Sequence, residues 1–111
     1  GFTPAPNDSA PMKGATTVEI ISPDPNTEYV ISRELPLSAQ AIEIAARWNG
    51  DTPPQQLILL LDGEPLATLH QPPYRILWTL QPGTHVATAQ AMDATGQTVT
   101  SRPLRFTVTQ P

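Results

Sequence analysis

Residues 80–97 read LQPGTHVATAQAMDATGQ, and this stretch decides the fold class. A Pro-Gly turn opens it and an Asp-Ala-Thr-Gly turn closes it, while small side chains recur at every second position in between, at Ala87, Ala89 and Ala91. A period of two residues is typical of a β-strand with one buried face. We therefore predict a long inner strand over residues 84–93, bounded by two tight turns.

The same stretch contains a histidine and an aspartate, His85 and Asp93, which together suggest acid–base chemistry. An extended chain rises by about 3.3 Å per residue, so a separation of eight residues places the two about 26 Å apart. Residues at opposite ends of one strand cannot form a catalytic pair. We instead predict that His85 hydrogen-bonds back to the Pro82-Gly83 turn, as a corner tyrosine does in other sandwiches, and that Asp93 accepts N–H groups of its own turn.

Further strand candidates extend in both directions from this stretch. Asp62-Gly63 is a strong hairpin signal, and the continuous apolar run before it, residues 57–61, predicts a strand buried on both faces. A helix is the alternative for residues 41–48, because Ala, Glu and Arg favour helices, but their period of two favours a strand. The strand candidates are TVEII (17–21), EYVIS (28–32), AIEIAARW (41–48), LILLLD (57–62), EPLATLH (64–70), RILWTL (75–80), THVATAQAMD (84–93) and TVTSRPLRFTV (98–108), the last interrupted at Pro103.

Seven or eight short strands with frequent turn signals and no convincing helix predict an all-β fold, an Ig-like or fibronectin-III-like antiparallel β-sandwich. A chain of 111 residues suits one such domain, which we place at residues 17–109. Residues 1–16 contain few large apolar side chains, so we predict a flexible linker or tail there. The chain begins with Gly1 rather than Met, and we expect it to be a piece of a longer protein.

Composition and charge exclude several classes of function. The absence of cysteine excludes disulfide bonds and thiolate metal sites. The net charge is −4 and the six Lys and Arg residues form no run, which argues against nucleic-acid binding. The apolar run at residues 57–61 is far shorter than a membrane helix of about 20 residues, so we expect no membrane insertion by this domain. We expect the domain to be a monomer.

The sequence predicts no catalytic, cofactor-binding or metal-binding residues. The G-x-S-x-G motif and the motif set of β-lactam-binding enzymes are absent, as are the glycine-rich phosphate-binding motifs. Two histidines, without cysteine or an H-E-x-x-H motif, argue against zinc. Asp62, Glu64 and Asp93 lie near turns where calcium binding is the alternative, but we favour turn-capping roles for these acids.

Aromatic side chains are the remaining route to a binding function. Tyr29, Trp48 and Tyr74 are candidates for ligand contact, because an exposed aromatic face can stack on a sugar ring. Packing in the core is the alternative for each, and we expect Tyr74, which follows two prolines, to be partly exposed. Trp78 is assigned to the core, because the residues two positions before and after it are also apolar.

Residues 20–44, IISPDPNTEYVISRELPLSAQAIEI, resemble the start of the C-terminal domain of bifunctional penicillin-binding proteins of the subclass 1C type. The sequence departs from that family in a longer loop at residues 49–56 and in the strand before Asp-Gly, where family members often have a Trp. The second half of the chain also resembles generic bacterial Ig-like domains. The segments that resemble the later part of the family are LLLDGEPL (59–66), RILWTL (75–80), QPGTH (81–85) and DATGQ (93–97).

The resemblance implies a non-catalytic accessory domain of a peptidoglycan synthase, with the glycosyltransferase and transpeptidase sites in upstream domains. No catalytic residues are therefore carried over to this chain. The implied location is the periplasm, on a membrane-anchored parent protein. The implied partners are upstream domains of that parent or another cell-wall protein, with a role in protein–protein contact or positioning. Two alternatives are a module that binds glycan or peptidoglycan, and a structural Ig-like spacer of a secreted or cell-surface protein.

Overall fold

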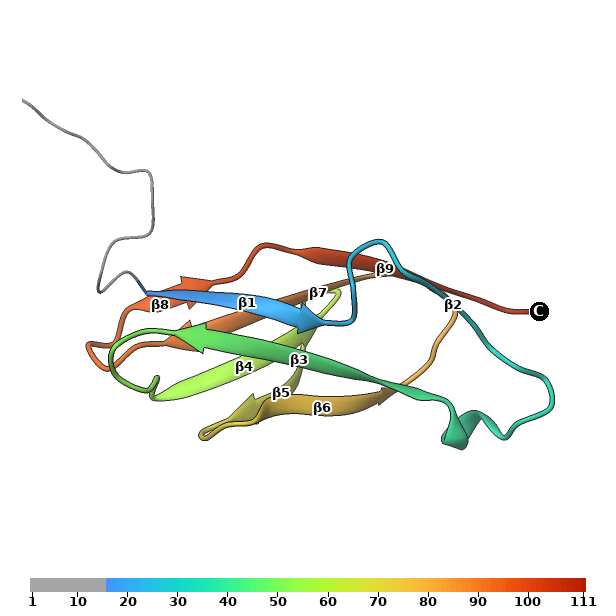
Figure 1. Ribbon diagram of the computed structural model, residues 1–111, viewed down its shortest axis with the longest axis horizontal. Helices are drawn as coiled ribbons and strands as arrows, with labels where there is room; N and C mark the ends of the chain where they lie inside the picture. Colours follow the sequence, from blue (N-terminus) through green and yellow to red (C-terminus); the bar gives the residue numbers. More distant parts are fainter. Residues whose placement is uncertain (1–15) are drawn as a thin grey trace, which may run out of the picture.

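Two β-sheets packed face to face form the protein in the computed structural model, which describes residues 16–111 (Figure 1). The predicted linker, residues 1–16, lies outside the described residues apart from Thr16. Within the described residues, no helix is long and apolar enough to cross a membrane. The elements are β1 (Thr17–Ser22), β2 (Glu28–Val30), the 3-10 helix η1 (Leu37–Ala39), β3 (Ala41–Asn49), β4 (Gln56–Leu61), β5 (Glu64–Leu69), β6 (Tyr74–Thr79), β7 (Gly83–Met92), β8 (Thr98–Thr100) and β9 (Leu104–Thr109).

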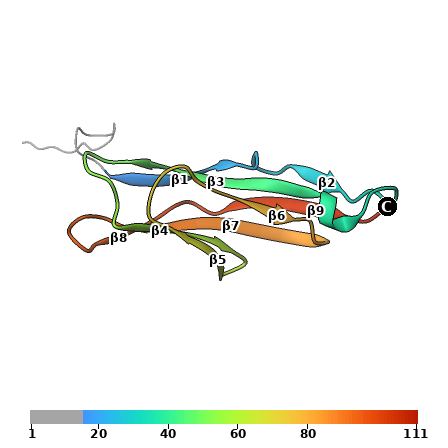
Figure 2. The same ribbon diagram turned by 90° about the horizontal axis from the view of Figure 1, so that it is seen from below.

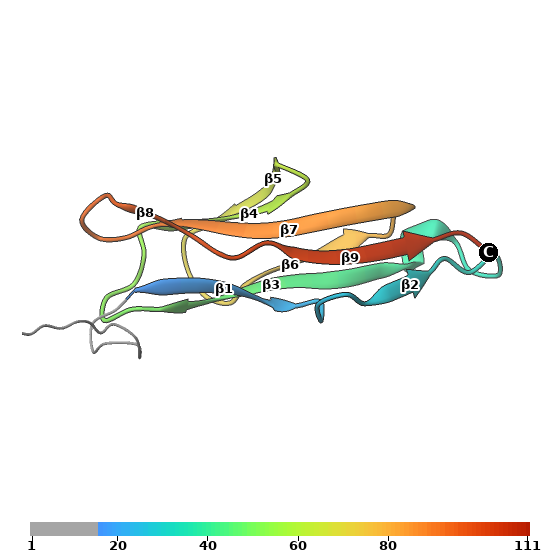
Figure 3. The same ribbon diagram turned by 90° about the horizontal axis from the view of Figure 1, so that it is seen from above.

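The two sheets differ in size and lie as two layers, with β4 and β7 in one and β1 and β3 in the other (Figure 3). The smaller sheet has the strand order β1-β3-β6. The larger has the order β2-β9-β7-β4-β5, with β8 paired to β7. This confirms the predicted all-β sandwich, although the described residues form nine strands rather than seven or eight, and the β2–β9 pair is parallel rather than antiparallel.

The ninth strand arises because residues 98–108 do not form one continuous strand. They divide into β8 and β9, separated by Ser101, Arg102 and Pro103. Proline has no N–H to donate to a β-ladder, which ends regular pairing at this point. β8 pairs with the end of β7, while β9 pairs with its start.

The parallel pair arises because the chain changes sheets between β1 and β2 without reversing direction (Figure 1). After β1, residues 23–27 lead the chain across to β9 in the other sheet. There the Asn26 N–H donates to the Arg105 carbonyl at 2.8 Å, and the Ile31 N–H donates to the Thr109 carbonyl at 2.9 Å. Asn26 adopts a φ of 60°, a left-handed conformation that asparagine tolerates well.

Strand β4 contradicts one expectation about its burial. Leu57, Leu59 and Leu61 are buried, but Ile58 and Leu60, on the opposite face, are only half-buried. The reason is that the facing sheet covers one side of the larger sheet only. The β4–β5 hairpin projects from that sheet on the side away from β1 and β3 (Figures 2 and 3).

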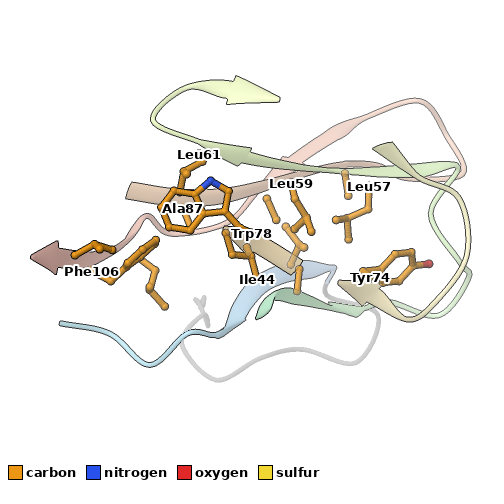
Figure 4. Close-up of a cluster of buried hydrophobic side chains, with 14 of the residues drawn as sticks. Ile44, Leu57, Leu59, Leu61, Tyr74, Trp78, Ala87 and Phe106 are labelled. Atoms are coloured by element: carbon orange, nitrogen blue, oxygen red, sulfur yellow. The ribbon is translucent and has the colours of Figure 1, made fainter. Parts of the chain in front are cut away.

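The hydrophobic core lies between the sheets and has Trp78 and Phe106 near one end and Tyr74 near the other (Figure 4). Trp78 is buried as predicted, with its ring edge-on to Phe106 at a centroid distance of 5.7 Å. Ala87 and Ala89 on β7 are fully buried, and side chains this small let the opposing sheet pack closely against β7. The alternating stretch that predicted the fold thus supplies the inner face of β7.

Candidate functional site

The first candidate site is the corner that leads into β7, where His85 is 8% exposed. Its Nε2 atom lies 2.8 Å from the carbonyl oxygen of Gln81, which confirms the predicted hydrogen bond back to the turn. Its Nδ1 atom lies 2.7 Å from Oδ2 of Asp62, a partner that the sequence did not reveal. Trp78 packs edge-on against the ring at a centroid distance of 4.9 Å.

Both polar partners of the His85 ring are hydrogen-bond acceptors, one a carbonyl and the other a carboxylate. A neutral imidazole has one N–H and can satisfy only one of them, whereas the imidazolium form donates to both. The ring thus links the Gln81 carbonyl to the Asp62 carboxylate. Since each ring nitrogen already has a partner within the protein, neither is free to take a proton from a substrate.

Asp62 is held in place by the β4–β5 hairpin. Asp62 and Gly63 have φ values of 54° and 83°, the left-handed pair expected for a two-residue Asp-Gly turn. Partial burial acts to raise the pKa of Asp62, but the hydrogen bonds from His85 and from the Val86 N–H, together with the His85 charge, outweigh it and lower the pKa below its ordinary value. Asp62 is thus an anchor between the hairpin and the start of β7.

Asp93 lies just beyond the other end of β7 and caps its own turn, as predicted. Its Oδ1 accepts hydrogen bonds from the Thr95 N–H and the Gln97 N–H, each at 2.9 Å, and from the Thr95 hydroxyl. These bonds, with that of the Thr95 side chain foremost, lower the pKa of Asp93. Asp62 and Asp93 therefore belong to different ends of the sandwich, and among residues 16–111 no three His, Cys, Asp or Glu side chains are grouped to hold a metal ion.

The second candidate site comes from the three predicted contact residues, of which the structure brings two together. Tyr29 on β2 packs edge-on against Phe106 at 6.1 Å, near the end of the sandwich where β7 begins. Trp48 lies at the opposite end of the sandwich, as the second-last residue of β3. Tyr74 opens β6 and pairs with Ala46, two residues before Trp48.

Trp48 and Tyr74 line a groove with a volume of about 620 Å³ between the β3–β4 loop and the start of β6. We call it the Trp48 groove, and its other lining residues include Pro53, Pro54, Pro72 and Pro73. Tyr74 is 7% exposed, so the expectation of a partly exposed side chain was wrong, and its burial raises its pKa. A larger groove of about 970 Å³ lies between β1 and residues 99–105, but no aromatic side chain lines it.

The comparisons with known proteins agree with this architecture. The sequence model of the Penicillin-Binding Protein C-terminus Family matches residues 8–106. The chain belongs to this family. The match confirms the resemblance to a penicillin-binding-protein C-terminal domain that residues 20–44 suggested. It extends that resemblance over most of the chain.

Solved structures place this penicillin-binding-protein C-terminal domain among fibronectin-III-like folds. The fibronectin(III)-like modules of CbhA from Clostridium thermocellum have a TM-score of 0.71 at 19% identity, over 84% of this chain and 96% of that chain. CopC from Methylosinus trichosporium OB3b has a TM-score of 0.45 at 16% identity, over 84% of this chain and 94% of that one. No curated protein sequence matches the chain significantly. At such low identity the CbhA modules show the fold alone.

Proposed function

We propose that this chain is a non-catalytic accessory domain at the C-terminus of a periplasmic, membrane-anchored peptidoglycan synthase. The family match over residues 8–106 is the observation that carries the proposal. The contacts of His85 support a non-catalytic role, because both ring nitrogens of this buried histidine already have partners within the domain, Asp62 and Gln81. In this proposal the glycosyltransferase and transpeptidase sites lie upstream, and the domain acts as a monomer in protein–protein contact or positioning.

The test compares the full-length parent protein with a version that ends before residue 17. We expect both proteins to be acylated by a fluorescent penicillin at similar rates, because the reacting groups lie outside this domain. We expect the truncated protein to produce less cross-linked glycan in cells, because its catalytic domains are no longer positioned. Loss of penicillin acylation in a truncated protein that still unfolds cooperatively would show that the domain contributes to catalysis.

A glycan-binding module is the second candidate function, and the Trp48 groove is the observation that favours it. Pockets lined by aromatic and apolar side chains, with a few convergent polar groups, are the usual binding sites of small ligands. This candidate is compatible with the accessory role, because binding the glycan product is one way to position a synthase.

A further inference from the structure

The Trp48 groove exists because β6 begins only at Tyr74, opposite Ala46, and so leaves the last three residues of β3 unpaired on that side. The register between β3 and β6 ends at Ala46 and Tyr74, whereas the register between β3 and β1 continues to Asn49 and Thr17. The residues before Tyr74 are Pro72 and Pro73, which have no N–H to continue a ladder. The last residues of β3 therefore have no strand beside them on this side, and the groove takes the place of the missing ladder.

The ring of Trp48 is fixed in the wall of this groove before any ligand arrives. Its Nε1–H donates to the Thr52 carbonyl at 2.9 Å, so the indole has no donor left for a ligand. Gly50 lies against the ring, and a Cβ added there would come within 3.0 Å of Nε1. With its N–H engaged, the indole is left to interact through its ring surface, by contact with C–H groups. A side chain held in one position loses little conformational entropy on binding.

The hydroxyl of Tyr74 is the second feature of the groove, after the fixed Trp48 ring, that suits a ligand. Tyr74 is 7% exposed as a whole residue and lines the groove, and its hydroxyl makes no hydrogen bond to another residue in the described part of the chain. Tyrosine combines an apolar ring with a polar tip, so the ring of Tyr74 can pack in the core while its hydroxyl faces the groove. Figure 4 shows the Tyr74 oxygen at the far end of the side chain, turned away from Ile44 and Leu57 in the core. A polar group of a ligand in the groove would supply the missing partner.

The rim of the groove carries balanced charge. Arg47 lies 3.4 Å from Glu19, and Arg75 lies 3.1 Å from Glu43, so each arginine already has a carboxylate partner. Of these four residues only Glu19 lies outside the lining, and Asp51 joins it, so the lining holds two arginines and two carboxylates. This balance favours neither an anionic nor a strongly cationic ligand. It suits a neutral molecule with C–H faces and hydroxyl groups.

We propose that the Trp48 groove binds a neutral oligosaccharide, with a sugar ring against the Trp48 indole and a sugar hydroxyl or amide bonded to the Tyr74 hydroxyl. The site itself rests on the geometry above. The choice of an amino-sugar chain rests on the proposed role in a peptidoglycan synthase. Carbohydrate contacts of this kind fit the apolar, aromatic lining and the few polar groups of the groove.

The test titrates the ¹⁵N-labelled chain with a β-1,4-linked tetramer of N-acetylglucosamine, and separately with the corresponding glucose tetramer. We expect chemical-shift changes at the Trp48 indole N–H and at the amides of Gly50, Thr52 and Arg75. W48F and Y74F should each weaken binding by about tenfold or more, which corresponds to about 1.4 kcal/mol. Y74F should leave thermal stability unchanged, because the hydroxyl that it removes has no partner within the fold. The control R102A, in the larger groove, should bind like the wild type.

The outcomes separate the site from the proposed function. Binding of the N-acetylglucosamine tetramer at these residues supports both. Binding of the glucose tetramer alone would support the groove and contradict its assignment to cell-wall glycan. Absence of shifts with either tetramer at millimolar concentrations, or shifts clustered away from Trp48, would overturn the proposal. If neither sugar binds but a proline-rich peptide shifts the same resonances, the groove is a protein-contact site and the sugar proposal is overturned.

Discussion

Oδ2 of Asp62 lies 2.7 Å from Nδ1 of His85, although the two residues are 23 positions apart in the sequence. The contact joins the turn of the β4–β5 hairpin to the corner before β7, two features that the sequence suggests separately. β4 and β7 are neighbours in the larger sheet, and Leu61 pairs with Ala87 beside this contact. The His85–Asp62 contact therefore fixes the hairpin on the edge of the core.

Replacing Asp62 with asparagine tests this contact with little change in shape. Asparagine tolerates the φ of 54° at this position, so D62N removes charge without backbone strain. We expect the free energy of unfolding to fall by about 1 kcal/mol, at the low end for a charge-assisted bond because Asp62 is partly exposed. Urea denaturation measures the change. E64Q, in the same hairpin, serves as the control, and equal stability of D62N and wild type would refute the anchoring role.

Acid should destabilise the protein through the same carboxylates. The pKa values of Asp62 and Asp93 are both lowered in the folded protein, so each contributes stability above its unfolded pKa of about 3.9. That stability is lost as the pH falls from about 3.9 through the folded pKa values. We expect the double variant D62N/D93N to show a flatter decline of the midpoint of thermal unfolding below about pH 4. An identical acid profile in the double variant would contradict these hydrogen-bond assignments.

Ser101 replaces a missing ladder bond between β7 and the chain that leads into β9. Its Oγ accepts the buried Ala89 N–H at 2.8 Å, in the gap between the registers of β8 and β9 with β7. S101A leaves that N–H without a partner, and we expect a loss of about 1–3 kcal/mol in the free energy of unfolding. T100A, an exposed neighbour, is the control. A loss of less than about 0.5 kcal/mol in S101A would mean that water replaces the hydroxyl.

Gly50 is expected to be essential for the position of Trp48. In G50A the new Cβ would lie 3.0 Å from Nε1 of Trp48, so the ring or the loop must move. We expect the indole N–H resonance to shift and its hydrogen bond to Thr52 to weaken. T52A keeps the accepting carbonyl and should leave that resonance nearly unchanged. An unaltered indole resonance in G50A would show that the loop adjusts without moving the ring.

Local patterns predicted the strands and turns of this protein well. Strand propensity and a period of two are properties of neighbouring residues, so they can be read from the sequence. They predicted the inner face of β7, the Asp-Gly hairpin and the break at Pro103. The parallel pairing of β2 with β9 was missed, because it depends on the chain crossing between sheets after Ser22. Partners of this kind are set by tertiary packing.

The candidate site was only partly predictable for the same reason. Trp48 and Tyr74 were recognised as possible contact residues from their type, but their meeting in one groove depends on where β6 begins. The burial of Tyr74 was missed because two preceding prolines suggested an exposed loop. The pairing of His85 with Asp62, rather than with Asp93 in its own stretch, follows from the adjacency of β4 and β7. No local pattern encodes that adjacency.

The most direct test of the central claim, that this is a non-catalytic domain of a peptidoglycan synthase, is to map the penicillin-acylated residue in the full-length parent protein. The protein is labelled with a penicillin, digested, and analysed by mass spectrometry. We predict one acylated peptide that lies upstream of this chain, and none within residues 1–111. Acylation within residues 1–111, or a parent protein that is not acylated at all, would contradict the claim.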